Sequence, residues 1–184
     1  FSQSLILDNQ HYISFTNKVV DADIHVIPYG GAIDHTLNIS SDLIKKHPFL
    51  ESNYFLSISR ALEDNMMYEL CSSFRNTDKI LVLISNFSSS RYGMRVYETF
   101  ENDDNIFLIN GLYVKPELDL IRRSCVAYIH THTLCGTAPS LVEMIVSGRP
   151  ILSVDIPQNR FTLQNQSMYY SDFGVLRSVV ENTQ

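Results

Sequence analysis

The chain has 184 residues, a formal net charge of −6 at pH 7, 45% hydrophobic residues and 18% charged residues. This composition excludes intrinsic disorder, and the length suits one domain of ordinary size. The acidic balance argues against non-specific nucleic-acid binding, which needs a basic surface, so we expect no nucleic-acid partner. No apolar run is long enough to cross a membrane, and no signal peptide is visible.

The cysteines indicate the compartment in which the protein works. Cys71, Cys125 and Cys135 are odd in number and form no CxxC pair. This usage is typical of a reducing compartment rather than of a disulfide framework, so we expect a cytoplasmic protein. Because the chain begins with Phe1 rather than Met, we also expect it to be a piece of a longer protein.

The N-terminal third carries irregular signals. The segments "SLILDN" and "IHVIPYGG", with a helical stretch from His11 between them, lead into the remainder of the chain. Residues 32–53 contain Pro48 and several polar residues, so we expect a connection with about one helical turn.

The remaining chain alternates between two patterns. Apolar runs rich in β-branched and aromatic residues begin roughly 20–25 residues apart, which leaves room for the crossovers that parallel strands require. These runs are "YFLSIS", "KILVLIS", "NIFLIN", "CVAYIH" and "PILSVD". Helical patterns lie between them at 65–75, 92–100, 116–123 and 138–147. We expect a loop at 156–166, a last short strand in "SMYYSD" and a closing amphipathic helix in "FGVLRSVVEN". The alternation predicts an α/β protein with a doubly wound parallel sheet.

One helix start stands out as a ligand site. In open α/β sheets, ligands bind beyond the carboxyl ends of the strands, next to helix N-termini. Gly136 and Thr137 introduce the helix after "CVAYIH", with Thr137 suited to be its N-cap. Free backbone N–H groups and the helix dipole then favour an anion, most often a phosphate. Both the Gly-rich dinucleotide fingerprint and the P-loop are absent, so a nucleotide would bind in another mode.

Glu143 is a single carboxylate in an otherwise apolar helix. It could accept two hydroxyl hydrogen bonds, as from the vicinal diol of a ribose at the pocket edge. The alternative is a salt bridge to a neighbouring element, and the sequence leaves both open.

His130, His132 and Cys135 could also be drawn as a metal site. Alternation along a strand places both histidines on one face, but no fourth ligand is obvious and the spacing matches no usual zinc pattern. We therefore expect no metal, with the histidines packed near the pocket or touching a ligand. The position of Cys135 near His132 and a helix start suggests a thiol of lowered pKa.

The stretch "YIHTHTLCGTAPSLVEMIVSGRPILSVDIPQNR" resembles the nucleotide-sugar-binding segment of GT-B glycosyltransferases, and most closely that of retaining bacterial enzymes of the rhamnosyltransferase-like type. Upstream, "IPYGGAID" and "YFLSISRALEDN" resemble segments of the same enzymes, so the likeness covers most of residues 20–165. The matching positions in the first stretch are His130, His132, Gly136, Thr137, Pro139, Ser140, Leu141, Glu143, Gly148, Pro150, Asp155, Asn159 and Arg160.

The resemblance implies roles for particular residues. Glu143 would accept hydrogen bonds from the ribose, and Arg60 would neutralise the donor diphosphate. Gly136, Thr137 and the helix start that includes Ser140 would hold the diphosphate or the sugar hydroxyls. Tyr113 sits where such enzymes hold the nucleobase, and His132 could reach the sugar but would at most support catalysis.

Two positions depart from the pattern. Cys135 replaces a glutamate or a glycine, and Asn65 stands where a lysine is common, although closer relatives also have asparagine. With a single basic residue on the diphosphate, the helix dipole would carry more of the charge.

The resemblance implies a Rossmann-like fold forming the C-terminal half of a GT-B enzyme. We expect residues 1–22 to be the tail of an N-terminal domain or a linker, 23–172 the donor-binding domain and 173–184 a C-terminal helix. The expected activity is hexosyl transfer from a nucleotide-diphosphate sugar to a glycan in polysaccharide biosynthesis, with no cofactor. The acceptor would bind through a missing N-terminal domain, so we expect residues 1–184 alone to bind donor weakly and not to turn over. Peripheral association of the full-length protein with the inner face of the membrane would be compatible with this. The alternatives are a degenerate, non-catalytic nucleotide-sugar-binding module and a GT-B nucleotide-sugar epimerase.

Overall fold

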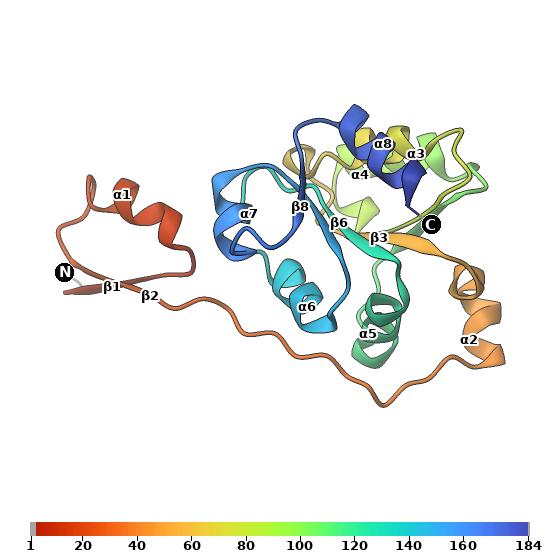
Figure 1. Ribbon diagram of the computed structural model, residues 1–184, viewed down its shortest axis with the longest axis horizontal. Helices are drawn as coiled ribbons and strands as arrows, with labels where there is room; N and C mark the ends of the chain where they lie inside the picture. The colour runs from red at the N-terminus through yellow and green to blue at the C-terminus, as the bar shows by residue number, and fades with distance from the viewer. Residues whose placement is uncertain (1–2, 184) are drawn as a thin grey trace.

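The computed structural model describes residues 3–183 (Figure 1). Residues 1–2 of the predicted N-terminal segment and residue 184 of the predicted C-terminal helix lie outside this part. Its centre is a six-stranded, wholly parallel sheet with the strand order β5-β4-β3-β6-β7-β8. This is the order of dinucleotide-binding Rossmann sheets, in which successive strands are added first on one side of the first strand and then, from the fourth strand on, on its other side. The strands are β3 (Tyr54–Ile58), β4 (Ile80–Ser85), β5 (Ile106–Asn110), β6 (Ala127–His130), β7 (Ile151–Val154) and β8 (Met168–Tyr170). The predicted doubly wound α/β fold is confirmed.

Continuous apolar runs form these strands because both sheet faces are covered. Tyr54 and Leu56 point to one face and Phe55 to the other, and all three are buried. Helices α3 (Met67–Phe74), α4 (Arg91–Phe100) and α8 (Phe173–Asn182) lie on one side of the sheet. Helices α5 (Lys115–Ser124) and α6 (Pro139–Ser147) lie on the other, as Figure 1 shows. Each of these five helices begins within two residues of a predicted boundary.

The loop predicted at 156–166 is wrong, because helix α7 occupies Pro157–Thr162. Proline is favoured in a first helical turn, and Pro157 provides this start signal. The segment is too short for an apolar period to show, and Asn159, a polar residue, is its buried member. Helix α7 therefore depends on the buried polar contacts that its neighbours supply rather than on an amphipathic pattern.

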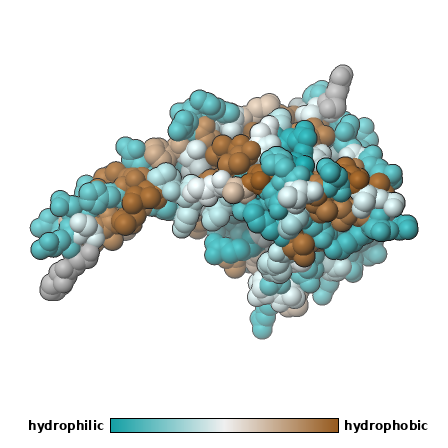
Figure 2. Space-filling model, turned by 90° about the horizontal axis from the view of Figure 1, so that it is seen from below, coloured by the Kyte–Doolittle hydropathy of each residue, from teal (hydrophilic) through white to brown (hydrophobic). Residues whose placement is uncertain are grey.

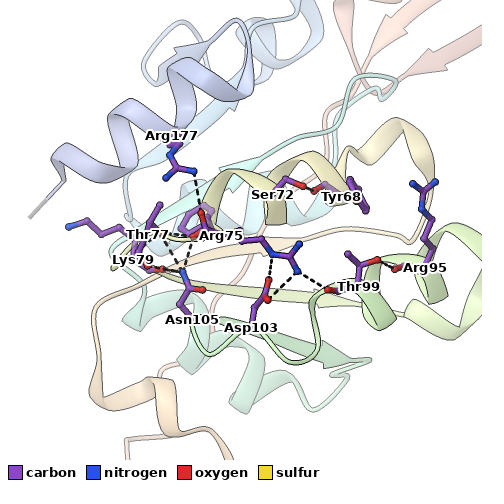
Figure 3. A network of polar contacts seen from close by, with 11 residues as sticks. Tyr68, Ser72, Arg75, Thr77, Lys79, Arg95, Thr99, Asp103, Asn105 and Arg177 are labelled. Atoms are coloured by element: carbon purple, nitrogen blue, oxygen red, sulfur yellow. Dashed lines mark hydrogen bonds and ion pairs between the residues drawn. The ribbon is translucent and has the colours of Figure 1, made fainter.

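A polar network fixes the amino end of β5 against two helices (Figure 3). Arg75, at the end of α3, donates to both carboxylate oxygens of Asp103 at 2.8 and 3.1 Å and to the Thr99 carbonyl at 2.8 Å. Asn105 donates to the carbonyl of Lys79 at 2.8 Å, and Arg177 of α8 donates to the Arg75 carbonyl at 3.2 Å. These contacts lie at the end of the sheet opposite the carboxyl ends of the strands, so they stabilise the scaffold.

An N-terminal arm projects from this body. Strands β1 (Ser4–Leu7) and β2 (Asp23–Val26) pair in parallel, with a 3-10 turn at Gln10–Tyr12 and helix α1 (Ile13–Thr16) between them. The predicted boundary at residue 22 thus falls between two strands that pair with each other. Figure 2 shows apolar surface gathered on the arm. Its exposed large apolar residues are Ile6, Phe15, Val19, Val20 and Ile27.

An extended segment at 27–40 leads from the arm past α6 and α5 to helix α2 (Ser41–Lys46) (Figure 1). The predicted connection therefore contains α2 and a 3-10 turn at Pro48–Glu51. Lys115 donates to the Ala32 carbonyl at 2.8 Å and Arg123 to the Leu37 carbonyl at 2.7 Å. Side chains of α5 thereby hold the extended backbone. Between residues 3 and 183, no helix combines the length and apolar character needed to cross a membrane.

Candidate functional site

A cavity lies where the sheet order predicts a ligand, beyond the carboxyl ends of β3 and β6. Its volume is about 1000 Å³, the upper end of the range for small-molecule sites. Segments 58–62, 84–86, 111–113 and 134–140 supply most of the wall. Six of the residues to which the resemblance assigns a role line it, Arg60, Tyr113, His132, Gly136, Thr137 and Ser140, and Cys135 lines it as well. Asn65 and Glu143 are not among the lining residues.

Arg60 is the cation of the pocket. It follows β3 directly, is exposed, and forms no ion pair with any residue between 3 and 183. Asn65 is 1% exposed, and its side-chain amide donates to the Arg60 carbonyl at 2.7 Å. Asn65 therefore shapes the turn that carries Arg60 and does not itself face the cavity.

Tyr113 and Ser140 line the cavity from two different elements. Tyr113 follows β5 and is 81% exposed, so its ring is free to lie against a planar group in the pocket. It also packs beside Gly111, whose φ of +70° places that residue in the left-handed region. Ser140 lies in the first turn of α6, and its hydroxyl accepts a hydrogen bond from Tyr128 at 3.3 Å.

The N-terminus of α6 already holds a carboxylate, that of Asp8. The Thr137 N–H donates to Asp8 Oδ2 at 3.0 Å, and the Thr137 hydroxyl donates to the Asp8 carbonyl at 2.8 Å. The prediction that Thr137 caps the helix is wrong, because Ala138 is the N-cap residue and Thr137 is engaged by the arm. Gly136 leaves room for this carboxylate, since a Cβ on it would lie 2.7 Å from Asp8 Oδ2 and would displace the Asp8 side chain. The anion that this helix start attracts is thus supplied in part by the chain itself.

Two further residues anchor the arm beside the pocket, and sequence reasoning missed both along with Asp8. Asn9 is fully buried and donates to the Gln158 carbonyl at 3.4 Å and to the Thr162 hydroxyl at 3.3 Å. The Tyr12 hydroxyl donates to the Cys135 carbonyl at 2.9 Å. Polar residues after a short apolar run carry no signal for such long-range contacts, which depend on how the arm folds back.

Glu143 has a protein partner, which was the alternative left open by the sequence. Its Oε2 accepts a hydrogen bond from Arg122, which also donates to buried Asp119 at 2.7 Å. The Glu143 side chain is 30% exposed, and Ile145 and Val146 are exposed as well, so α6 is open to solvent on one side. The other carboxylate oxygen, Oε1, has no hydrogen-bond partner within the described chain.

Asp119 anchors this network from α5. Burial alone would raise its pKa, but hydrogen bonds from Lys115, from the Asp34 backbone N–H and from Arg122 outweigh burial and hold the pKa below its ordinary value. Asp119 is therefore ionised at neutral pH, which keeps Arg122 in place next to Glu143.

His130, His132 and Cys135 meet beside the pocket. The ring centroids of the two histidines are 4.3 Å apart, and His130 is completely buried. Burial lowers the pKa of His130 well below its ordinary value and that of His132 to about 4, with Arg60 adding to the latter effect and Asp64 opposing it. Both rings are therefore neutral at pH 7.

The lowered pKa expected for Cys135 is wrong. Burial, with the nearby charges of Asp64 and Asp8, raises the pKa of this thiol to about 11, although Arg60 acts in the opposite direction. A helix start lowers a thiol pKa only when its field is not already neutralised, and here Asp8 occupies it. Cys135 is consequently a protonated thiol at neutral pH.

No family model matches this sequence, and no curated protein matches it either. Solved structures do match in fold. Sucrose-phosphate synthase from Thermosynechococcus elongatus superposes with a TM-score of 0.74 at 11% identity, over 97% of this chain and 48% of that one. Anabaena HepE, in complex with UDP and glucose, superposes with a TM-score of 0.74 at 13% identity, over 98% of this chain and 53% of that one. An α,α-trehalose-phosphate synthase (UDP-forming) from Burkholderia vietnamiensis gives 0.74 at 12%, over 96% and 52%.

The chain thus spans about half the length of the structures that it matches. At such low identity the likeness establishes the fold and leaves the chemistry to the site. The described chain has the Rossmann-like α/β fold of one half of these GT-B glycosyltransferases.

Proposed function

We propose that the chain is the donor-binding domain of a glycosyltransferase that uses a nucleotide-diphosphate sugar. The observation that carries this proposal is the cavity beyond β3 and β6, which combines the exposed cation Arg60, the helix start at Gly136 and the exposed ring of Tyr113. A cation, free backbone N–H groups and an aromatic face suit a diphosphate, sugar hydroxyls and a base. The matched HepE was crystallised with UDP and with UDP-glucose, so uridine nucleotides are the first donors to try.

In this proposal the residues divide the donor between them. Arg60 neutralises the diphosphate, Tyr113 stacks on the base, and Ser140 binds the sugar or diphosphate from the first turn of α6. Glu143 does not line the cavity, but it lies three residues beyond Ser140 on the same side of α6, and its Oε1 has no partner among the described residues. We assign Oε1 to the ribose hydroxyls while Oε2 stays with Arg122.

The chemistry follows from position and charge. The donor carries its sugar already activated, so the pocket has to fix the donor and stabilise the leaving diphosphate. We propose transfer with retention to a glycan acceptor, as in hexosyl transfer for polysaccharide biosynthesis, with His132 as a neutral group able to contact the sugar. We propose that the residues that bind the acceptor, and those responsible for any membrane association, lie outside residues 1–184. Support comes from the exposed apolar residues of the two-stranded arm, since such a small parallel pair is not stable alone in water.

Calorimetry with a panel of nucleotide sugars tests donor binding. We expect one UDP-sugar to bind and Arg60→Ala to weaken it about 10- to 100-fold, as for loss of a charged hydrogen bond. Glu143→Ala should weaken the binding of nucleotides with an intact ribose more than it weakens the binding of their 2′-deoxy counterparts. Arg177→Ala, which removes an exposed cation far from the cavity, is the matched control and should leave affinity unchanged. The absence of binding by every donor would overturn the proposal.

A non-catalytic binding module is the second candidate, and the Asp8 carboxylate at the start of α6 favours it. There it occupies an N–H group that an active enzyme would offer to the donor. Donor binding without transfer by the full-length protein, combined with transfer gained in Asp8→Ala, would support this second reading. Transfer by the unmodified full-length protein would exclude it.

A further inference from the structure

We propose that His130, His132 and Cys135 form a binding site for one transition-metal ion, best suited to Zn²⁺, with a coordination position open to the pocket. One ligand atom from each residue lies within 4.8 Å of the others. Two ligand atoms on one tetrahedral zinc ion stand about 3.3–3.8 Å apart, given Zn–N and Zn–S distances near 2.0–2.3 Å. Side-chain rotations that close up to about 1.5 Å would therefore complete the set.

The second observation is that these nitrogens lack partners. Neither ring nitrogen of the fully buried His130 forms a hydrogen bond with residues 3–183, and the enclosed Nε2 of His132 forms none either. The Asn159 amide lies near enough to His130 to favour its charged form slightly, but no hydrogen bond joins them. A buried polar atom without a partner costs about 1–3 kcal/mol, so three such atoms in one place need an explanation. Coordination of an ion would satisfy one nitrogen of each ring.

The local charges suit a cation. Asp64 and Asp8 both act on Cys135, and Asp64 also acts on His132. Arg60 is the opposing cation that acts on His132 and Cys135, which leaves an excess of negative charge around the three ligands. Imidazole and thiolate together select borderline metals such as Zn²⁺ over Mg²⁺ or Ca²⁺, which prefer oxygen ligands.

The fourth ligand that the sequence lacks need not come from the protein. His132 and Cys135 both line the cavity, so the fourth position faces it and a water molecule or a ligand oxygen can complete a tetrahedron. The Cys135 thiol donates to Asn159 Oδ1 at 3.6 Å, and the sulfur–metal bond would replace this weak hydrogen bond. This role of the ion rests on the proposed function. The ion would face the donor diphosphate as a second positive charge beside Arg60, because Asn65 carries no charge.

Binding has a defined proton balance. Histidine binds a metal as the neutral imidazole and cysteine binds it as the thiolate, so the Cys135 thiol, protonated at pH 7 at its ordinary pKa, must release its proton when the sulfur–metal bond forms. We therefore expect about one proton released per Zn²⁺ bound at pH 7. The released proton is measured by calorimetry in buffers of different ionisation enthalpy.

The test titrates chelator-stripped, tag-free protein with Zn²⁺ and Co²⁺. We expect one ion per chain, and a cobalt adduct with a thiolate-to-metal charge-transfer band that Cys135→Ser abolishes. Loss of a residue that only hydrogen-bonds to a metal ligand typically weakens metal binding about 10- to 100-fold. His132→Ala removes a ligand itself and should therefore weaken zinc binding by more than this. His35→Ala removes an exposed histidine and is the matched control, with no effect expected.

A second readout avoids variants that fail to fold. Zn²⁺ should protect Cys135 of the unmodified protein from alkylation, followed by mass spectrometry of its peptide, while Mg²⁺ should not. Absence of a charge-transfer band, or equal alkylation with and without Zn²⁺, would overturn the proposal. Because zinc binding is measured without a nucleotide, failure of the metal site and failure of donor binding are separate results.

Discussion

Two buried polar regions flank the cavity, and they differ in how their groups are satisfied. In the α5 network, Asp119 accepts hydrogen bonds from Lys115, the Asp34 backbone and Arg122, and the buried nitrogens of α5 without a partner among residues 3–183 are the Nε atoms of Arg122 and Arg123. At the end of β6, in contrast, three ring nitrogens of His130 and His132 have none within the described chain. The paired charges of α5 hold the extended backbone segment at 27–40 in place. The unpartnered nitrogens at the end of β6 are instead available to bind an ion.

The largest effect should come from breaking the paired region. Asp119→Ala leaves Arg122 buried beside Glu143 alone, and loss of one partner of a buried ion pair typically costs about 3–5 kcal/mol. Chemical denaturation gives the change in the free energy of unfolding. The matched control is Glu181→Ala, which breaks an exposed helix pair with Arg177 and should cost about 0.3–0.5 kcal/mol. Similar losses for the two variants would contradict the assigned role of the network.

The second prediction uses pH to probe the unpartnered region. The pKa of His132 falls from 6.5 in the unfolded chain to about 4 in the folded one, and that of His130 is also lowered. The unfolded state therefore binds more protons between these values, so stability is present above pH 6.5 and is lost as the pH falls towards 4. We expect metal-free protein to lose about 2 kcal/mol through His132 between pH 7 and pH 5, and His130 should add to this loss.

This measurement separates histidines from carboxylates. Asp119 and Glu117 have lowered pKa values, so their contribution to stability is lost only below the ordinary carboxylate range, outside the pH 5–7 window. His132→Gln should reduce the loss between pH 7 and pH 5. An equal free energy of unfolding at both pH values would show that the two rings are not neutral in the folded protein.

A smaller effect is expected at the junction of arm and pocket. Asp8→Ala removes the carboxylate that accepts from the Thr137 N–H, and loss of such an interaction at a helix start costs about 1 kcal/mol. Thermal unfolding at constant pH measures it, with the exposed Asp21→Ala as the matched variant. If the two variants unfold at the same temperature, the arm does not stabilise α6.

The smallest change in the free energy of unfolding is expected for a substitution of His130. In chelator-treated protein, His130→Leu removes two unpartnered nitrogens and should alter the free energy of unfolding by less than about 1 kcal/mol, or raise it. His47→Leu is the comparison, because this equally enclosed histidine contacts Glu117 and its loss should cost about 1–3 kcal/mol. A larger loss for His130→Leu than for His47→Leu would reverse the contrast between the two regions.

The sequence predicted the sheet well because parallel strands buried on both faces leave continuous apolar runs, as in "KILVLIS". It also placed Arg60 and Gly136 beside one cavity, since residues after neighbouring parallel strands meet at one edge. Helix α7 was missed because one and a half turns without an apolar stripe show no period.

The polar partners were beyond the sequence. Asp8 reaches Thr137 across 129 positions, and Arg122 reaches Glu143 from a different helix. Neither contact leaves a periodic trace, because each depends on how separate elements pack. The wrong pKa direction expected for Cys135 has the same origin, since the sequence shows neither the burial of this thiol nor the carboxylates of Asp64 and Asp8 near it.

The most direct test of the central claim is NMR titration of the isotope-labelled chain with UDP-glucose. We predict shift changes in the backbone amides at the carboxyl ends of β3 and β6, above all Arg60, Gly136 and Thr137, with little change near Arg177. A titration that leaves those amides unmoved, for UDP-glucose and for the other nucleotide sugars, would contradict the assignment of this cavity to a donor.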